Sequence, residues 1–511
     1  MIKDLNKVLV IGLDGASFKV LEQAFRLGYA PHLHEFTQRG FRRMLKAPLP
    51  AESPISWPVI FTGLNPGKTG LFGWHDYSNP YRIRLETSQK IVGKAIWDIL
   101  STYNLKSIIV NVPMTYPPYR INGIMISGFP CPTNSLIAFP PSEEKKLRKY
   151  FPEYRIEPTK ITVEYSKIDE ELLLKEIINL TKIRTELCLY LMENYPWDFF
   201  FIVFTELDRA QHVFYEDDLQ GTHGRLLLYY LRFLDSCLAK IISKVDENTV
   251  ILILSDHGFE KVEKYIAINN LLEKIGYLKR RFKRLPLQDW FIFNLLRKMN
   301  IPMTYQMALK ILFRIPIINS LRKQPVKLDE AKAYCPDLGY IYVKEKQVIN
   351  EIIEKLYKLY DPETGKTVIR KIYRKEELFH GPYLENAPDL LVIPEEGYEV
   401  RSDGPFIIFS KDLITPSKRG THYGYASQLG IFILYPSILE IDQNVDVIRA
   451  EDVCPTLLSL FNLPIPSHLN GTSLIKRGPH VAIPNHIFET RLKIRSKIQK
   501  IKKRIKKNNI G

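Results

Sequence analysis

Cysteine is scarce in this sequence, and its placement excludes two kinds of stabilisation. The 511 residues contain five cysteines, an odd number, far apart and without a C-x-x-C pair. A disulfide scaffold needs denser, paired cysteines, and a thiolate metal site needs them closely spaced. We therefore expect a protein of a reducing compartment, the cytoplasm, without sulfur ligands to a metal.

Long apolar runs are also missing. No stretch approaches the roughly 20 consecutive apolar residues of a membrane-spanning helix. The N-terminal apolar run is short, ends in Asp14 and lacks the small-residue cleavage site of a signal peptide. With 45% hydrophobic and 12% aromatic residues, the chain has a globular composition, and its length suits one large domain with an insertion or two to three units.

Acidic residues are absent near the end of the chain. Residues 491–507, RLKIRSKIQKIKKRIKK, hold ten basic side chains, which account for most of the net charge of +16. The isoleucines recur at helical spacing and would form one apolar stripe on a basic helix: Ile494, Ile498, Ile501 and Ile505. Such a helix can lie on an anionic membrane. The alternatives are a solvated basic terminus and, more weakly, nucleic-acid contact, and we expect no specific nucleic-acid binding.

Short β-branched runs predict buried strands at residues 7–14, 107–113, 198–208 and 249–257. Uninterrupted apolar strands are typical of a parallel sheet covered on both faces. Helical patterns alternate with them, as at 170–195 and 224–245. The alternation predicts an α/β fold, a doubly wound, mostly parallel sheet with helices on both faces and an inserted cap region.

Changes of sequence texture predict four regions. Residues 1–259 are the first part of an α/β catalytic core, 260–385 the inserted cap region, 386–476 the second part of the core and 477–511 a basic C-terminal tail. In the cap region we expect basic, apolar helices at 284–325. The second core part is expected to have strands at 387–394 and 429–435 and a closing helix at 451–466.

Three aspartates, Asp14, Asp208 and Asp256, stand at the carboxyl ends of predicted strands, the edge where open α/β sheets bind ligands. Asp208 and His212 are four apart, so one face of a helical turn would hold both. His257 follows Asp256 directly, and His422 lies between glycines in an expected loop. Imidazole and carboxylate donors without thiolate suit zinc, with manganese as the alternative, and six donors divide into two sites of three.

A serine lies at a predicted helix start in PLPAESPISWPVIFTG, residues 48–63. Ser53 is expected at the N-cap, with Pro54 at the first helical position and Gly63 ending the helix. A hydroxyl there sits at the positive end of the helix dipole, which favours an anion such as phosphate. Ser53 is therefore a candidate nucleophile as well as a cap.

The order of these motifs resembles the alkaline phosphatase superfamily, in particular the type I phosphodiesterase/nucleotide pyrophosphatase branch. The resemblance runs from VLVIGLDGA through TGLNPGKTG to DVCPTLLSLFNLPIPSHLNGTSL. It implies that Ser53, nine residues before the Thr of the TG turn, is the nucleophile. It also implies two metal ions, one held by Asp208, His212 and His422 and the other by the remaining donors, namely Asp14, Asp256, His257 and the Ser53 oxygen.

The sequence departs from that family at two positions: Thr69 replaces a His common in the turn, which we read as neutral, and the second departure concerns specificity. Nucleotide pyrophosphatases carry an Asn twelve residues after the TG Thr, where this chain has Trp74. This puts nucleotide specificity in doubt, and Trp74 and His75 become candidate substrate contacts. The C/S-x-P-x-R sequence of sulfatases is absent around Ser53, which argues against sulfatase activity.

We therefore expect a two-metal-dependent phosphohydrolase, a phosphodiesterase/pyrophosphatase or phosphomonoesterase, that acts through a phosphoseryl intermediate. A phosphotransferase or phosphomutase would use the same site and return the phosphoryl group to an alcohol. An inactive membrane-docking module is disfavoured because no ligand or nucleophile is lost. The expected substrate is a phosphate ester, and a lipid-linked one would suit a membrane-associated enzyme.

Overall fold

The structure is a computed structural model, and it describes residues 7–79, 83–132, 135–158, 169–279, 326–336, 338–402, 412–422, 428–436, 441 and 445–475. The helices expected at 284–325 and the tail at 477–511 lie outside the described residues. Within them, no helix is both long and apolar enough to cross a membrane. All five cysteines are among the described residues, and none of them forms a disulfide.

A nine-stranded sheet forms the centre of the fold, in the order β18-β2-β17-β9-β1-β8-β5-β6-β7. The strands from β9 to β6 are parallel, and β17 runs antiparallel to β9. The strands are β1 (Lys7–Leu13), β2 (Phe41–Lys46), β5 (Ser107–Val112), β6 (Gly123–Ser127), β7 (Ala138–Phe139), β8 (Phe199–Phe204), β9 (Thr249–Leu254), β17 (Leu429–Tyr435) and β18 (Val447–Arg449). The strands predicted at 7–14, 107–113, 198–208 and 249–257 are β1, β5, β8 and β9.

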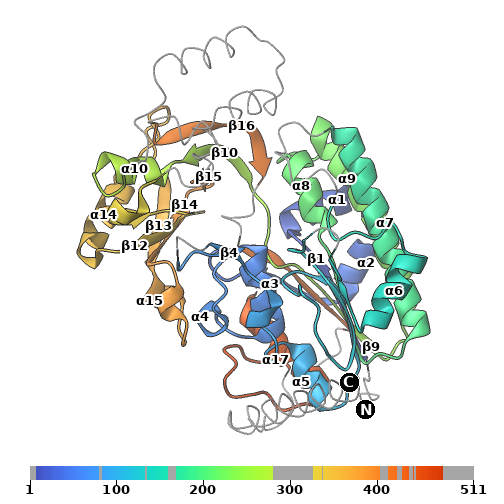
Figure 1. Cartoon of the computed structure of the whole chain (residues 1–511). Coiled ribbons are helices and arrows are strands. Elements are labelled where there is room, and N and C mark those ends of the chain that lie inside the picture. Colours follow the sequence, from blue (N-terminus) through green and yellow to red (C-terminus); the bar gives the residue numbers. More distant parts are fainter. Residues whose placement is uncertain are drawn as a thin grey trace.

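Helices cover both faces of this sheet, as expected for a doubly wound α/β fold (Figure 1). One face carries α1 (Phe18–Arg26), α2 (Pro31–Arg39), α6 (Pro141–Tyr150), α7 (Glu170–Asn194), α8 (Glu206–Phe214) and α9 (Thr222–Ile242). The other carries α3 (Ser53–Thr62), α5 (Ile96–Thr102) and α17 (Val453–Leu460). Each of the four predicted parallel strands is buried along nearly its whole length, which explains their unbroken apolar runs.

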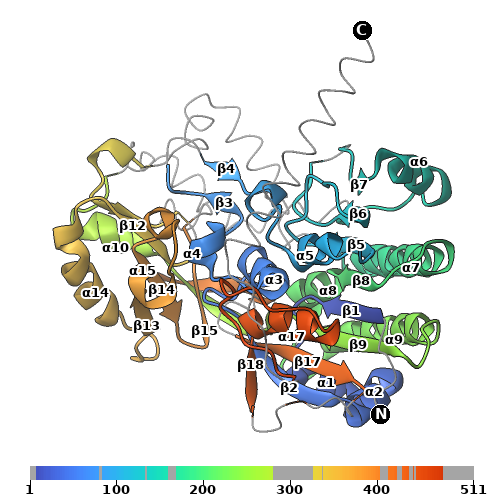
Figure 2. The ribbon, with the colours of Figure 1, turned by 90° about the horizontal axis from the view of Figure 1, so that it is seen from below.

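Two smaller sheets lie beside the large one, on the side of α3 and of α4 (Pro66–Thr69) (Figures 1 and 2). One contains β15 (Gly397–Val400), β10 (Lys261–Ile266) and β16 (Ile414–His422). The other contains β11 (Ala333–Tyr334), β12 (Tyr340–Val343), β14 (Leu390–Pro394) and β13 (Ile369–Arg374). The two small sheets share one hydrophobic core, which also contains residues of α10 (Ile268–Lys274) and α14 (Ile349–Tyr357). The strand predicted at 387–394 is β14, so the chain re-enters the nine-stranded sheet only with β17, later than residue 386.

Helix α3 begins one residue earlier than the sequence predicted. Its N-cap is Glu52, which has an extended backbone and whose carbonyl accepts from the N–H groups of Ile55 and Ser56. Ser53 is therefore the first helical residue and not the cap, and its hydroxyl is available for contacts outside the helix. Gly63 ends the helix in the left-handed conformation, as expected.

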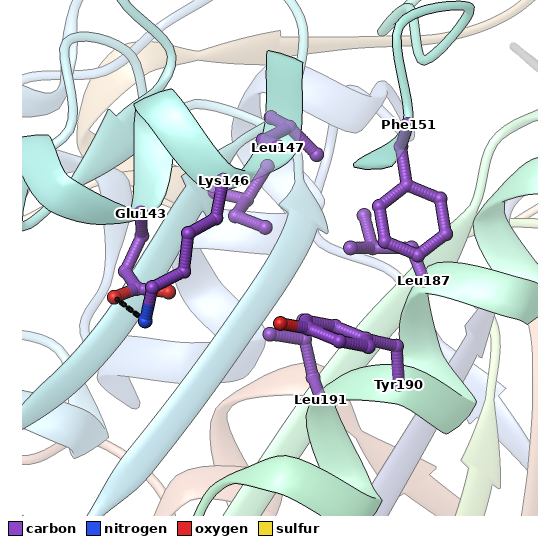
Figure 3. Close-up of a pocket in the computed structure, with 8 residues that line it drawn as sticks. Glu143, Lys146, Leu147, Phe151, Leu187, Tyr190 and Leu191 are labelled. Carbon is purple, nitrogen blue, oxygen red and sulfur yellow. Dashed lines mark hydrogen bonds and ion pairs between the residues drawn. The ribbon is translucent and has the colours of Figure 1, made fainter. Parts of the chain in front are cut away.

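A small cavity lies between α6 and α7 (Figure 3), and it is not part of the candidate site at the strand ends. Leu147, Phe151, Leu187 and Leu191 give it a mainly apolar lining. Its volume of about 10 Å³ holds about one water molecule, so it cannot take a substrate. None of its lining residues belongs to the candidate site.

Candidate active site

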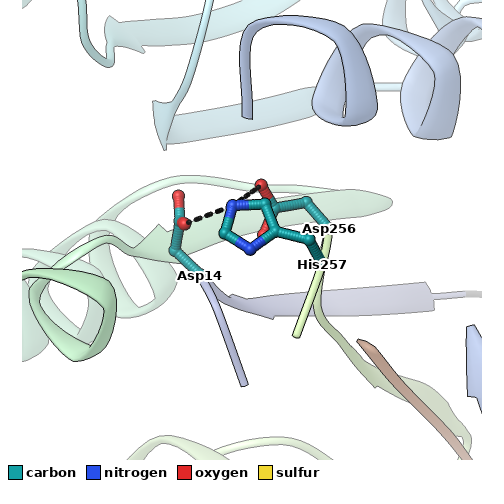
Figure 4. A group of neighbouring side chains, drawn as sticks. All are labelled: Asp14, Asp256 and His257. Atoms are coloured by element: carbon teal, nitrogen blue, oxygen red, sulfur yellow. Dashed lines mark ion pairs between the residues drawn. The ribbon is translucent and has the colours of Figure 1, made fainter. Parts of the chain in front are cut away.

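Three of the predicted donors meet where β1 and β9 end. Asp14 directly follows β1, and Asp256 and His257 follow β9 after one serine. All three side chains are buried, and one ligand atom from each lies within 4.8 Å of the others (Figure 4). The parallel pairing of β1 with β9 brings these sequence-distant segments to one edge of the sheet.

Ser53 points its hydroxyl into this group from the start of α3. Its Oγ donates to Asp14 Oδ1 at 3.3 Å and lies 3.2 Å from His257 Nε2. The His257 Nε2 atom is also 3.3 Å from Asp256 Oδ2 and 3.8 Å from Asp14 Oδ1. The structure therefore brings together the four residues expected to form one metal site.

The orientation of the His257 ring is fixed from behind. Its Nδ1 lies 2.8 Å from the backbone carbonyl oxygen of Gly258. A carbonyl can only accept, so Nδ1 carries a proton and donates it. In the neutral ring, Nε2 then has the free lone pair and faces the carboxylates, which is the arrangement of a metal-binding histidine.

The crowding of buried acids shifts their proton affinities. Burial, with the nearby charges of Asp256 and Asp208, raises the pKa of Asp14 well above its usual value. Burial also raises the pKa of Asp256. Burial alone would lower the pKa of His257, but the carboxylates of Asp256 and Asp14 raise it to about 9. A site with this surplus of negative charge attracts cations.

The second expected donor set begins on α8. Asp208 lies in the first turn of this helix and not in the strand predicted over 198–208, because β8 ends at Phe204. His212 stands one turn later, with Nε2 3.2 Å from Asp208 Oδ2. Burial would raise the pKa of Asp208, but His212 and the adjacent Arg209 lower it. The predicted i, i+4 pair on one helical face is therefore present.

His422 is the last residue of β16, opposite Lys261 of β10, and so lies in a strand and not in the expected loop. Strand β16 contacts α8, the helix that carries Asp208 and His212. The side chain of His422 lies outside the described residues. Its backbone position is thus beside the second donor set, and its role as a third ligand stays a prediction.

An arginine that the sequence reading passed over borders Asp208. Arg209 Nη1 is 2.5 Å from Asp208 Oδ2, and its Nε and Nη2 donate to the two carboxylate oxygens of Glu157 at 2.8 and 3.1 Å. The guanidinium also lies over the Phe129 ring, 5.6 Å from its centroid. Its position next to Asp208 in the sequence was the only signal that could have indicated it.

Trp74, with His75 next to it in the chain, contacts the same Phe129 ring as Arg209 does. Trp74 packs edge-to-face on Phe129, with ring centroids 4.9 Å apart. His75 belongs to the short strand β3 (His75–Asp76), and burial lowers its pKa. Among the described residues, neither side chain makes a hydrogen bond or ion pair with the donors of the two sets.

Two further residues support the donors and were missed. Trp57 Nε1 donates to Asp14 Oδ2 at 3.1 Å. Gln211 Nε2 donates to the carbonyl of Gly15 at 2.9 Å, and the Gly15 N–H contacts Asp256 Oδ1 at 3.3 Å. The only signal for either residue was its helical spacing, four residues after Ser53 for Trp57 and within the turn of Asp208 and His212 for Gln211. That spacing does not indicate which groups the two side chains contact.

Comparison with known proteins gives the family. A family model described as type I phosphodiesterase / nucleotide pyrophosphatase matches residues 8–405. No curated protein matches the chain in sequence.

Solved structures share the fold at low identity. Phosphonoacetate hydrolase from Sinorhizobium meliloti 1021 has a TM-score of 0.54 at 13% identity, covering 88% of this chain and 94% of its own. Human ectonucleotide pyrophosphatase / phosphodiesterase 5 has a TM-score of 0.51 at 13% identity, and the match covers 92% of this chain and 100% of the human one. The alkaline phosphatase PafA has a TM-score of 0.52 at 13% identity, and the match covers 93% of this chain and 99% of PafA. The chain shares its fold with these proteins, and the match over residues 8–405 shows that it belongs to the type I phosphodiesterase/nucleotide pyrophosphatase family and is a phosphoric ester hydrolase.

Proposed function

We propose that this hydrolase requires two divalent metal ions and transfers the phosphoryl group of its substrate first to Ser53 Oγ. The observation that carries the proposal is the position of this hydroxyl, at the start of α3 and 3.2–3.3 Å from His257 and Asp14. The partial positive charge of a helix N-terminus favours the phosphoryl oxygens there.

The chemistry of the donors fits metal ions. Asp14, Asp256 and His257 are buried and mutually close, and burial, together with the nearby carboxylate of Asp208, raises the pKa of both carboxyls. The buried Oδ2 of Asp256 accepts no hydrogen bond from the described residues. Carboxylate and imidazole donors without thiolate suit zinc, with manganese as the alternative.

Two donor sets would hold the ions. Asp14, Asp256 and His257 would hold one together with the Ser53 oxygen, and Asp208, His212 and His422 would hold the other. When bound, the ions supply positive charge that favours the ionised serine hydroxyl and offsets the charge on the transferring group.

The reaction has two displacements at phosphorus. The Ser53 oxygen forms a bond to phosphorus as the bond to the leaving oxygen breaks; the hydroxyl proton passes to solvent, and the leaving oxygen takes a proton from solvent to depart as the alcohol. Water then attacks the phosphoserine and gives a proton to solvent, the phosphorus–Oγ bond breaks, Oγ regains a proton, and the phosphate product leaves. If an alcohol replaces water in the second step, the enzyme acts as a phosphotransferase.

The test compares two serines of the same helix. Ser53→Ala should lower turnover of an aryl phosphate ester by at least ~10³ and abolish the acid-stable phosphoenzyme. Ser56→Ala is the matched control, because Ser56 is buried one turn along the helix and its hydroxyl has no hydrogen-bond partner among the described residues. Normal turnover by Ser53→Ala would refute the nucleophile. Adding an alcohol acceptor during the assay separates hydrolysis from transfer.

We also propose that Trp74 and His75 contact the substrate. Support comes from the packing of Trp74 on Phe129, since the same ring lies against Arg209, the neighbour of Asp208. A panel of monoesters and diesters with small and bulky leaving groups tests this. Trp74→Ala should alter the preference among leaving groups more than the turnover of the smallest ester.

For the cellular setting, we propose a cytoplasmic enzyme that docks on anionic membranes through residues 491–507. The support is sequence alone, ten basic side chains with isoleucines at helical spacing, and each basic residue near such a surface contributes ~1 kcal/mol. Membrane docking fits a lipid-linked phosphate ester as substrate.

A further inference from the structure

One carboxylate is bound at both oxygens by a single face of α3. Ser53 Oγ donates to Oδ1 of Asp14, and the indole Nε1 of Trp57 donates to Oδ2 at 3.1 Å. Ser53 and Trp57 are four residues apart, so their side chains leave the helix on the same side. The helix that carries the candidate nucleophile therefore also fixes the carboxylate opposite it.

The sheet makes room for this indole. Gly12 lies within the buried strand β1, where a glycine costs stability. A Cβ on Gly12 would lie 2.4 Å from Cη2 and 3.1 Å from Cζ3 of Trp57, closer than packed atoms allow. The indole also meets Phe201 of the neighbouring strand β8 edge-on, with ring centroids 6.0 Å apart. The absence of a side chain at Gly12 lets the ring lie against the sheet and reach Asp14.

We infer that Trp57 is a positioning residue, whose indole N–H holds the Asp14 carboxylate so that Oδ1 faces Ser53 and His257. The inference rests on the proposed function, because its effect is on metal binding and on the attack by Ser53. An indole N–H is suited to this task because it can only donate and does not titrate. Its proton therefore stays on Nε1 and occupies Asp14 Oδ2, which leaves Oδ1 for Ser53 and His257.

The direction in which this carboxylate points matters for the site. One ligand atom each from Asp14, Asp256 and His257 lies within 4.8 Å of the others, so a rotated Asp14 would turn its oxygen away from the other two. Loss of a hydrogen bond that supports a ligating residue typically costs 10- to 100-fold in metal affinity or activity.

The experiment uses two tryptophans in matched settings. Trp57→Phe removes the N–H and keeps an aromatic ring. Trp97→Phe is the control, because Trp97 is also fully buried in the same core and packs edge-on against Phe201, but its Nε1 donates to Tyr119 at 2.6 Å. Zinc affinity is measured by competition with a chromophoric chelator, and kcat and KM on an aryl phosphate.

We expect Trp57→Phe to bind zinc about 10- to 100-fold more weakly and to lose kcat with little change in KM at saturating zinc. Trp97→Phe should match the wild type in both measurements. If Trp57→Phe binds zinc and turns over like Trp97→Phe, Trp57 is only a core residue and the inference is wrong.

A measurement on the wild-type chain covers the case in which Trp57→Phe does not fold. With ¹⁵N-labelled indoles, the N–H signal of Trp57 should shift on addition of zinc while that of Trp97 stays in place. An unchanged Trp57 signal at saturating zinc would overturn the inference. If instead the wild type binds no zinc, the proposed metal dependence fails, whereas a zinc-bound, Ser53-dependent enzyme with an indifferent Trp57 refutes the positioning role alone.

Discussion

Proton binding and metal binding at His257 should oppose each other. In the metal-free protein the carboxylates of Asp256 and Asp14 raise the pKa of His257 to about 9, against 6.5 in the unfolded chain. A difference of roughly 2.5 units corresponds to about 3 kcal/mol of folding stability. Because the pKa is raised on folding, this stability is complete below about pH 6.5 and is lost as the pH rises through about 9.

The acids do not cancel this trend. Asp14 and Asp256 have raised pKa values, so their ionisation also destabilises the folded state as the pH rises. Asp208 has a lowered pKa, so its contribution is present at neutral pH and is lost only in acid. Between about pH 6.5 and 9 the metal-free protein should therefore lose stability.

Bound metal should remove this trend, because it needs the neutral imidazole. The zinc-loaded protein gives up no His257 proton as the pH rises, so the difference in unfolding free energy between loaded and chelated protein should grow by up to about 3 kcal/mol across this range. Urea unfolding of both forms at about pH 6, 7, 8 and 9 measures the difference. His257→Gln should flatten the slope of the chelated form.

Two results would refute this reasoning. Chelated protein that is as stable at about pH 9 as at pH 6.5 would show that His257 holds no extra proton in the folded state. A slope that survives in His257→Gln would assign the titration to other groups.

The remaining predictions concern the support of the site and the tail. Gln211→Ala removes the donor to the Gly15 carbonyl and should cost about 1 kcal/mol in unfolding free energy and lower kcat about tenfold. Gly15→Ala should cost more stability than Gly28→Ala, because both glycines have φ near +72° but only at Gly15 would a Cβ meet Gln211 Nε2, at 2.9 Å, whereas nothing lies within 4 Å at Gly28. Equal losses would show that backbone strain alone matters. A chain truncated after Pro484 should no longer co-sediment with anionic vesicles at low salt, and equal recovery of both chains would exclude docking by the tail.

Much of the central sheet could be predicted because its strands are buried on both faces. Unbroken apolar runs located β1, β5, β8 and β9, and the polar residues just beyond them marked the carboxyl edge. Strand β2 was missed, since it alternates buried and exposed residues and lies near the edge of the sheet. The sequence also could not show which sheet β14 belongs to, because a fully buried strand has the same apolar pattern in either sheet.

At the site, the sequence pointed to the proposed titratable donors, and it did not point to the contacts of the residues that support them. Aspartate and histidine stand out in a sequence, and the i, i+4 rule pairs Asp208 with His212 without knowledge of the fold. The contact of Trp57 with Asp14 joins residues 43 apart, and it depends on the way α3 packs on β1. A tryptophan in an apolar helix reads as core until that packing is known.

At the start of α3, the local pattern predicted the helix correctly but assigned the N-cap to the wrong residue. Ser-Pro before an apolar run predicted the helix correctly, but a capping serine would turn its oxygen back onto backbone N–H groups. In the structure the Glu52 carbonyl receives those N–H groups, and Ser53 Oγ turns outward to Asp14 and His257. The shift of the cap by one residue thus leaves the hydroxyl in contact with Asp14 and His257, as its proposed role as nucleophile requires.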